Sequence, residues 1–512
     1  MIFSPDYAEM HYKFKLPWSL LYRREPEIII DAPFQIVPGE NVQLFIVVRE
    51  ANRFPVTLES FFATFTDGGF SQKKTLKLRQ KIAEPFCFVP IDCGKLPPGN
   101  YEIKASVEIS IGKRKKRIQR FNLSGLKKSP LNICVLKENV PKPEGFIAGD
   151  VHAHTYYSAD PVEFGASPAV LQQAARAVGL DFVFCTDHSY DFAFEKNDYM
   201  VRADAEARYE ALRKEISELP KYPQMIAGEE ISAGNAQGKN VHLLLPGHTE
   251  YIPGEGDCGR NWLRNSPTLS IPQIVSKTEL PCFAAHPKEP MGRIERFIFN
   301  RGDWSAADLQ NESGNPIRGL EFWNGSRDKG FELGRKFWIS ELERGNFLLP
   351  LGGNDAHGDL NEYTGVKIPL LKLKRSRAHV FGYVRTVIQG ENAQKAFQIQ
   401  KTSLYITDGP ALWWKRDGEN VLFHAKSSED FGAIKSFTVF GQGASCKHER
   451  PLEISPERIS EFEATCRIPL QGFRYVRAEA ETDSGRFALT SACPATPGNV
   501  HTETSQPGSY CR

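Results

Sequence analysis

Between residues 145 and 400 the sequence alternates short apolar runs with amphipathic segments, and this alternation constrains the fold more than any other feature. Ser167 and Pro168 form an N-cap followed by a first-turn proline, and Gly179 is suited to end the helix that they begin. The pattern predicts helices over 169–178, 202–219, 271–278 and 331–344, and strands over 181–185, 225–231, 241–245, 282–285, 319–323 and 347–351. Repeated strand–helix units of this length favour a parallel sheet or a β/α barrel.

The segments on either side of this repeat have a strand-like pattern instead. Before residue 140, alternating runs are separated by the pairs Pro38-Gly39 and Pro98-Gly99, which is typical of a β-sandwich. Strand-like runs return after residue 400. Because 512 residues exceed what one hydrophobic core organises, we expect several domains. We predict an N-terminal β-sandwich domain over 1–140, a linker at 141–144, a central domain over 145–408, a C-terminal β domain over 409–493 and a flexible tail over 494–512.

Charge and composition exclude some classes of function. Lys and Arg total 64 and Asp and Glu total 62, a balance that argues against a dedicated nucleic-acid-binding protein. The basic run 113–117 lies between two strand-like runs, so we interpret it as a solvated hairpin tip. The ten cysteines form no C-x-x-C pair, which favours a reducing compartment. With no long apolar run, we expect a cytoplasmic protein without a membrane span, and the sequence predicts no particular oligomeric state.

Histidines gather at the ends of the predicted central strands. Six of the twelve histidines lie there: His152, His154, His188, His242, His286 and His357. In a β/α barrel the carboxyl ends of the strands form the active-site face. His152 and His154 stand two residues apart in Gly-Asp-Val-His-Ala-His-Thr, and residues at this spacing in a strand face the same side. Asp355 and His357 repeat the spacing, and Glu230 lies at the end of another apolar run.

A metal site explains these residues better than a structural role does. A lone histidine at a strand end is usually a hydrogen-bonded structural residue. Six of them at equivalent positions, together with two acidic residues, favour ligation of an ion. Imidazole and carboxylate ligands suit Zn, Fe or Mn, and no thiolate cluster competes with them.

In its order of motifs this chain resembles the polymerase-and-histidinol-phosphatase (PHP) superfamily. The match runs through His-x-His, Thr-Asp-His, Gly-x-Glu, a lone strand histidine, Ala-His-Pro and a closing Asp-x-His, over about residues 145–408. The Gly-Glu-Glu phrase, Leu-Glu-Phe-Trp-Asn-Gly at 320–325 and Tyr-Ile-Thr-Asp-Gly-Pro at 405–410 look most like the CehA/McbA-type metallohydrolases. The resemblance implies a central distorted (β/α)7 barrel, flanked here by the two β-sandwich-like domains, with two or three divalent transition-metal ions.

The resemblance also implies roles for single residues. His152, His154, Glu230 and Asp355 would hold a first ion, Glu230 would bridge to a second ion with His242 and His286, and Asp160, His188 and His357 would hold a third. Asp160 departs from the family pattern, because the acid in Ser-Ala-Asp-Pro stands one place later than in Ser-Asp-Gly. The Gly-x-Glu spacing favours Glu230 over Glu229. Catalytic roles fall to Glu230 and to Asp187, the latter as a general acid or as a partner of a ligand.

A metal-dependent hydrolase follows from this ligand set. Two ions that share a carboxylate lower the pKa of a bridging water, supplying hydroxide, and polarise the scissile group. We expect a small-molecule phosphoester as substrate, with Lys288, Arg293 and Arg260 near strand ends to meet the phosphate. A carboxylic ester, amide or carbamate is the alternative bond. A binding protein with a vestigial barrel is the alternative of another class, and the complete ligand set argues against it. Glu321 and Asn324, also at a strand end, fit packing as well as substrate contact.

Overall fold

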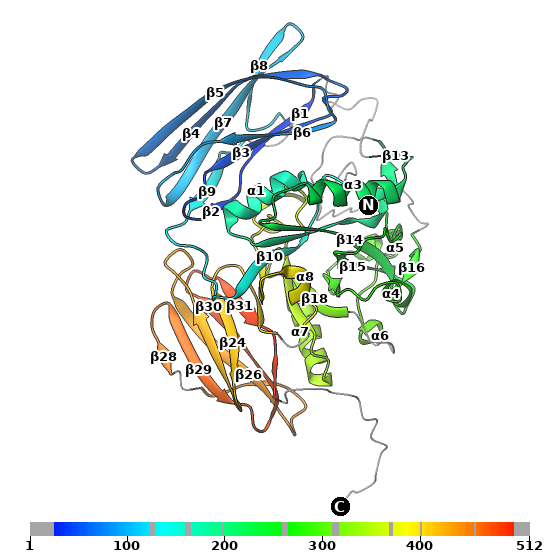
Figure 1. Cartoon of the computed structure of the whole chain (residues 1–512), viewed down its shortest axis with the longest axis vertical. Coiled ribbons are helices and arrows are strands. Elements are labelled where there is room, and N and C mark those ends of the chain that lie inside the picture. Colours follow the sequence, from blue (N-terminus) through cyan, green and yellow to red (C-terminus); the bar gives the residue numbers. More distant parts are fainter. Residues whose placement is uncertain are drawn as a thin grey trace, which may run out of the picture.

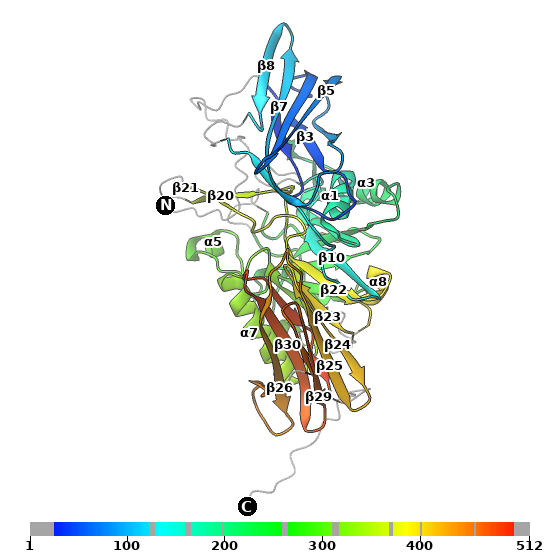
Figure 2. The same ribbon diagram turned by 90° about the vertical axis from the view of Figure 1, so that its left-hand side faces the viewer.

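A computed structural model describes residues 25–122, 128–158, 165–195, 198–258, 265–309, 317–367, 372–399, 402–454 and 457–495. The protein is a multidomain, β-rich molecule with few helices (Figure 1). Three regions follow one another along its long axis: an N-terminal β region (β1–β9), a central region (β10–β23) and a C-terminal β region (β24–β32). The view from the side shows the same succession (Figure 2).

Two sheets that share one apolar core make up the N-terminal β region. Its strands are β1 (Glu27–Asp31), β2 (Gln35–Ile36), β3 (Gln43–Arg49), β4 (Val56–Asp67), β5 (Phe70–Ile82), β6 (Phe86–Asp92), β7 (Gly99–Ile111), β8 (Arg114–Gln119) and β9 (Leu131–Val135). One sheet has the order β1-β3-β6 and the other β2-β9-β7-β4-β5, with β8 on β7. Ile46, Phe61 and Val107 are fully buried between the sheets, since alternate residues of each strand face inward. The basic run 113–117 lies at the β7–β8 hairpin, as the pattern predicted.

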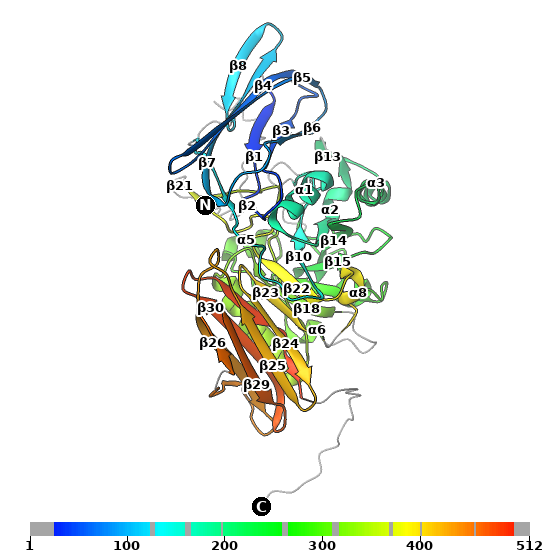
Figure 3. The same ribbon diagram turned by 60° about the vertical axis from the view of Figure 1, so that its left-hand side comes forward.

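The central region carries the helices. Its strands are β10 (Phe146–Ala153), β11 (Phe182–His188), β12 (Phe194–Glu195), β13 (Asp198–Arg202), β14 (Gln224–Gly234), β15 (Asn240–Pro246), β16 (Leu269–Ser270), β17 (Cys282–Ala285), β18 (Ile317–Asn324), β19 (Leu349–Gly353), β20 (Tyr363–Lys367), β21 (Lys372–Ser376), β22 (Arg385–Gln389) and β23 (Leu404–Thr407). Its helices are α1 (Pro168–Val178), α2 (Ser189–Phe192), α3 (Ala205–Ser217), α4 (Ile271–Val275), α5 (Arg293–Ile298), α6 (Ala306–Leu309), α7 (Lys329–Arg344) and α8 (Ala393–Ala396). Helices α1, α2 and α3 lie together on one side of this region (Figure 3).

The four helices predicted from the sequence are present as α1, α3, α4 and α7, with shifted ends. The capping residues explain why the predicted bounds, 169–178, agree closely with those of α1. The Ser167 side chain accepts a hydrogen bond from the Val170 backbone N–H, and Gly179 adopts the left-handed conformation with φ 80°. Helix α4 ends at Val275, earlier than the predicted residue 278. In the described part of the chain, no helix is both long and apolar enough to span a bilayer.

The central strands form a mixed sheet rather than an all-parallel one. Along the order β19-β18-β17-β15-β14-β11-β10-β22-β23, the pairs β10–β11, β11–β14, β17–β18 and β18–β19 are parallel, while β15 runs antiparallel to both β14 and β17. Residues 235–239 form the hairpin loop between β14 and β15, which is too short for the crossover that a parallel neighbour requires. Among the described residues, β19 returns to β10 through a parallel bridge between Ala153 and Ala356 and a hydrogen bond from Asp355 N to His152 O, 2.8 Å long.

The large sheet continues into the C-terminal β region. This region contains β24 (Ala411–Asp417), β25 (Asn420–Lys426), β26 (Ile434–Gly443), β27 (Arg450–Pro451), β28 (Arg458–Ile459), β29 (Glu463–Pro469), β30 (Phe473–Thr482), β31 (Phe487–Thr490) and β32 (Cys493–Pro494). Strand β23 pairs with β31, which leads on to β30, β26 and β27, and a second sheet has the order β24-β25-β29-β28. The predicted boundary at residue 408 therefore falls where one sheet passes from the central to the C-terminal region.

Candidate metal centre

Three overlapping groups of histidine and carboxylate side chains meet in the central region. Within each group the potential ligand atoms lie within 4.8 Å of one another. Cluster A is His152, His154, Glu230 and Asp355; cluster B is Glu230, His242 and His286; cluster C is His154, His188 and His357. These side chains are mostly buried, and each of the three clusters could hold a divalent metal ion. The predicted ligands other than Asp160 thus come together from β10, β11, β14 and β15 and from the segments after β10, β17 and β19.

The interatomic distances in cluster A suit a small ion. Asp355 Oδ1 lies 3.0 Å from His154 Nε2 and 3.4 Å from His152 Nε2, and the two nitrogens are 3.2 Å apart. Glu230 Oε2 lies 3.4 Å from each of these nitrogens. In a tetrahedron with metal–ligand bonds of about 2.0–2.1 Å, neighbouring ligand atoms are about 3.3 Å apart. Glu230 is fully buried, and imidazole nitrogens surround its Oε2, so this oxygen fits a metal ligand.

Glu230 belongs to two clusters through different oxygens. Its Oε2 faces cluster A, and its Oε1 lies 3.0 Å from His286 Nε2 and also contacts His242 Nδ1. His188 Nδ1 lies 2.9 Å from Glu230 Oε2, which links cluster C to cluster A. One carboxylate therefore belongs to both clusters through different oxygens.

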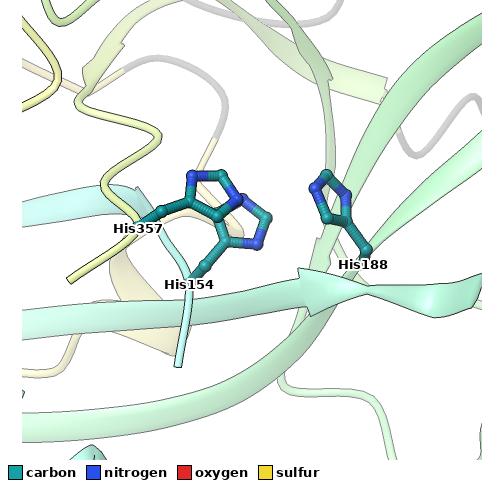
Figure 4. A group of neighbouring side chains, drawn as sticks. All are labelled: His154, His188 and His357. Atoms are coloured by element: carbon teal, nitrogen blue, oxygen red, sulfur yellow. The ribbon is translucent and has the colours of Figure 1, made fainter. Parts of the chain in front are cut away.

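Cluster C is built from three imidazoles (Figure 4). The rings of His154 and His357 stack with centroids 4.0 Å apart, and His188 faces them from β11, 4.4 Å from His154. The carboxylate predicted for this ion, Asp160, lies outside the described residues, as does Arg260. His154 takes part in both clusters A and C.

Two of the candidate ligands have a strained backbone. Asp355 and His286 adopt positive φ angles of 50° and 26°, which side-chain-bearing residues rarely do. His286 directly follows the last residue of β17, and Asp355 lies two residues after the end of β19. Strain of this kind persists where the surrounding structure imposes it, and it is frequent at functional sites. Here it turns a carboxylate and an imidazole toward the other ligands.

The electrostatics of the centre favour added positive charge. Burial opposes protonation of His152, but the carboxylates of Asp355 and Glu230 outweigh it and raise the pKa of the imidazole well above its usual value. Burial likewise opposes ionisation of Glu230, yet the imidazoles of His242 and His152 hold the pKa of this carboxyl well below its usual range. Glu230 thus stays charged and His152 attracts a proton, a pattern that a divalent cation would satisfy directly.

The side chains around the ligands fix their orientation. Asp187 accepts hydrogen bonds from the backbone N–H and hydroxyl groups of both Thr155 and Ser158, at 2.8–2.9 Å. Ser158 Oγ in turn lies 3.0 Å from His154 Nδ1, so Asp187 holds the loop that positions His154. Of the two roles predicted for Asp187, its contacts match that of a ligand's partner.

Glu321 and Asn324 also contact candidate ligands and orient them. Glu321 Oε2 accepts a hydrogen bond from the His286 backbone N–H at 3.0 Å and lies 3.5 Å from His152 Nδ1. Asn324 Nδ2 donates to Asp355 Oδ2 at 3.2 Å, which leaves Oδ1 facing cluster A. Both residues belong to β18, which Asn324 ends.

The contacts found for Lys288 are with residues outside the clusters. Lys288 Nζ donates to the Trp304 carbonyl oxygen and stands 4.5 Å above the Phe337 ring. Arg293 is exposed on α5. Sequence reasoning missed Asp257, Glu289 and Arg301, which lie beside His242 and His286. No spacing motif marks these three, because they come from loops whose course only the fold determines.

Comparison with known proteins gives no assignment. No protein-family model and no curated protein matches this chain. Among solved structures, a Parabacteroides merdae beta-glucuronidase has 9% sequence identity and a TM-score of 0.17, with 91% of this chain and 78% of that one covered. A Paenibacillus cycloisomaltooligosaccharide glucanotransferase has 10% identity and a TM-score of 0.16, covering 91% and 71%. Scores this low do not indicate a shared fold, so the function rests on the residues of the centre.

Proposed function

We propose that this protein is a metal-dependent hydrolase of the PHP superfamily, most similar to its CehA/McbA-type members, with a distorted (β/α)7 barrel as its central domain. One observation carries the proposal: Glu230 presents one oxygen to cluster A and the other to cluster B. A buried carboxylate shared between two imidazole groups is the arrangement that a two-metal hydrolytic site needs. Cluster C offers a third position.

Some residues of the centre would bind the ions, and others orient these ligands. Clusters A and B would hold Zn, Mn or Fe, and such ions lower the pKa of a bound water and polarise the scissile bond. Glu230 fixes the spacing between the two positions. Asp187 and Ser158 set the tautomer of His154 by leaving its Nε2 for cluster A, and Asn324 orients Asp355 in the same manner.

A small-molecule phosphoester is the first candidate substrate, because the superfamily resemblance favours it. The contacts of Lys288 favour a second candidate, a carboxylic ester, amide or carbamate. Its ammonium group is held by the Trp304 carbonyl and the Phe337 ring, so one expected phosphate ligand is already engaged. A vestigial site is a poor description of clusters A and B, which lack none of their predicted ligands.

Elemental analysis and a substrate panel test the proposal together. Protein purified without chelator should contain more than one transition-metal ion per chain. A chromogenic phosphomonoester, a phosphodiester, a carboxyl ester and single-stranded DNA should then be assayed in parallel with added Mn or Zn. Hydrolysis of a phosphoester supports the first candidate, and hydrolysis of the carboxyl ester alone supports the second. A folded protein that takes up no Mn, Zn or Fe would contradict the metal site itself.

A further inference from the structure

Behind cluster B, each histidine meets a second carboxylate. His242 contacts Glu230 through Nδ1, and its other nitrogen, Nε2, lies 2.9 Å from Asp257 Oδ2. His286 faces Glu230 with Nε2, and its Nδ1 lies 3.3 Å from Glu289 Oε2. A carboxylate on the far nitrogen fixes the tautomer and the ring orientation of an imidazole ligand. Both histidines of cluster B are therefore oriented from outside, by residues that no sequence motif indicated.

Arg301 joins these two carboxylates. Its guanidinium group contacts Asp257 Oδ2 and His242 Nε2, and it lies 3.3 Å from Glu289 Oε2. The Arg301 side chain is 9% exposed and that of Asp257 is 5% exposed, so both charges are largely removed from water. Asp257 is buried and Glu289 is partly exposed, with 22% of its side chain in contact with solvent, and both lose stabilisation when the arginine that they share is removed.

The backbone sets the position of Arg301 relative to the ligands. Arg301 forms a parallel bridge with Asn240, the first residue of β15, and Gly302 N donates to Asn240 O at 2.8 Å. His242 lies two residues further along the same strand. Asp257 also contacts Ser232 Oγ, and Ser232 pairs with His242 across the β14–β15 register. The arginine, its carboxylates and the ligands thus belong to one connected unit.

Cluster A has a separate set of orienting partners. Glu321 and Asn324 orient His152 and Asp355, and Asp187 acts through Ser158 on His154. No contact between Arg301 and these partners is found in the described part of the chain. A change at Arg301 should therefore affect one cluster more than the other.

We propose that Arg301 is a positioning residue for metal binding at cluster B, because it holds Asp257 and Glu289 against the outer nitrogens of His242 and His286. The proposal rests on the proposed function, since it concerns an ion held by Glu230 and the two histidines. It assigns to Arg301 no contact with substrate. Loss of the Arg301 side chain therefore removes the ion of cluster B from the protein and leaves the ion of cluster A in place.

The experiment compares Arg301→Met with a matched variant, Arg477→Met. Arg477 is likewise a buried arginine between two carboxylates, Glu449 and Glu479, but it lies on β30 in the C-terminal β region. Ions per chain are counted by elemental analysis, and the affinity of each site is followed by Co²⁺ absorption during titration of the metal-free protein. Arg301→Met should retain one ion fewer than the wild type, or bind it at least about 10-fold more weakly, as loss of an outer partner does. Arg477→Met should match the wild type in both measurements.

Two further variants show whether the metal is lost from cluster B. His286→Ala removes a ligand of cluster B, and the double variant with Arg301→Met should lose no more metal than His286→Ala alone. Arg301→Lys keeps the charge but not the paired contacts, and should restore part of the lost affinity. If Arg301→Met does not fold, Arg301→Lys takes its place, and a Co²⁺ affinity within twofold of the wild type overturns the proposal. Wild-type stoichiometry and affinity in Arg301→Met also overturn it, whereas a wild-type protein that binds no ion overturns the proposed function.

Discussion

Glu229 and Glu230 are adjacent in the chain and fully buried, but they face opposite sides of β14. Glu229 Oε1 accepts hydrogen bonds from His248 Nε2 at 2.6 Å and from the Ile252 backbone N–H at 2.8 Å. Glu230 faces the clusters. Strand geometry therefore gives one glutamate a structural role and places the other among the candidate ligands.

This pair gives a matched test of the metal assignment. Glu230→Gln should reduce metal affinity beyond the roughly 10–100-fold cost of losing an outer partner, because it weakens two clusters at once. Glu229→Gln should lower stability by about 1–3 kcal/mol, through its buried hydrogen bonds, without changing metal content. Elemental analysis and chemical denaturation measure the two effects. Equal metal loss in both variants would contradict the separation of roles.

The pKa shifts predict different pH profiles for metal-free and metal-loaded protein. The raised pKa of His152 contributes stability that is complete below its ordinary value of 6.5 and disappears as the pH rises through the raised value. The lowered pKa of Glu230 contributes stability that is present above 4.5 and disappears as the pH falls. The Tm of chelator-treated protein should therefore be highest between pH 4.5 and pH 6.5. It should fall as the pH rises further, through the raised pKa of His152.

A bound divalent ion replaces the protons, so the metal-loaded protein should lack this alkaline decline. Differential scanning fluorimetry of both forms across the pH range measures the difference. Parallel Tm profiles above neutrality would show that His152 carries no such proton.

Which residues the sequence could predict depends on where their positions are set. His152, His154 and Asp355 could be found because a strand end and an i, i+2 spacing determine where they point. Asp257 and Arg301 could not, since they meet His242 only through loop paths that leave no periodic pattern. The same reasoning explains why Asp187 stayed ambiguous: its role depends on Ser158, and the contact is tertiary.

At the scale of elements, caps and apolar runs predicted where helices and strands lie but not how the strands are directed. Helix α1 follows from Ser167 and Gly179. The antiparallel course of β15 follows instead from the hairpin loop that leads to it, and the repeat of apolar runs carries no information on direction. The mixed sheet is the result.

Close packing between β10 and β19 gives an element-scale prediction. A Cβ atom on Gly353 would lie 2.7 Å from His152 Cβ and 3.0 Å from His152 N, so Gly353→Ala must push the end of β19 away from β10. Asp355 follows two residues later and should move with it. We expect a loss of about 1–3 kcal/mol in stability and reduced metal content. Gly69→Ala, where a Cβ would meet nothing within 4 Å, is the control, and equal effects in both variants would contradict the steric argument.

At the scale of the whole molecule, the N-terminal β region is packed against the segments that carry the ligands. Phe86 and Phe88 of β6 contact Tyr156 edge-on, at centroid distances of 6.1 and 6.2 Å, two residues beyond His154. Asp31 Oδ2 accepts a hydrogen bond from Leu360 N at 3.0 Å, three residues beyond His357. This region therefore supports the metal centre in addition to forming its own core.

Removing residues 1–140 should consequently lower metal content and Tm together, even though every candidate ligand remains. Removing residues 496–512, which lie within the tail predicted over 494–512, is the control and should change neither quantity. Elemental analysis and thermal unfolding of the two truncated chains measure this. A truncated protein that lacks 1–140 but keeps the wild-type ion count would show that the N-terminal β region is independent of the centre.

The pairing of β23 with β31 also bears on how the chain folds while it is synthesised. Strand β23 leaves the ribosome well before Phe487–Thr490, its antiparallel neighbour. Until those residues emerge, one edge of β23 has unpaired backbone groups, and such an edge is a template for another chain. Chains that terminate early in the C-terminal β region keep that edge permanently. Aggregation of the nascent product, rather than a missing ligand, is therefore the defect that nonsense mutations near the end of this gene should cause.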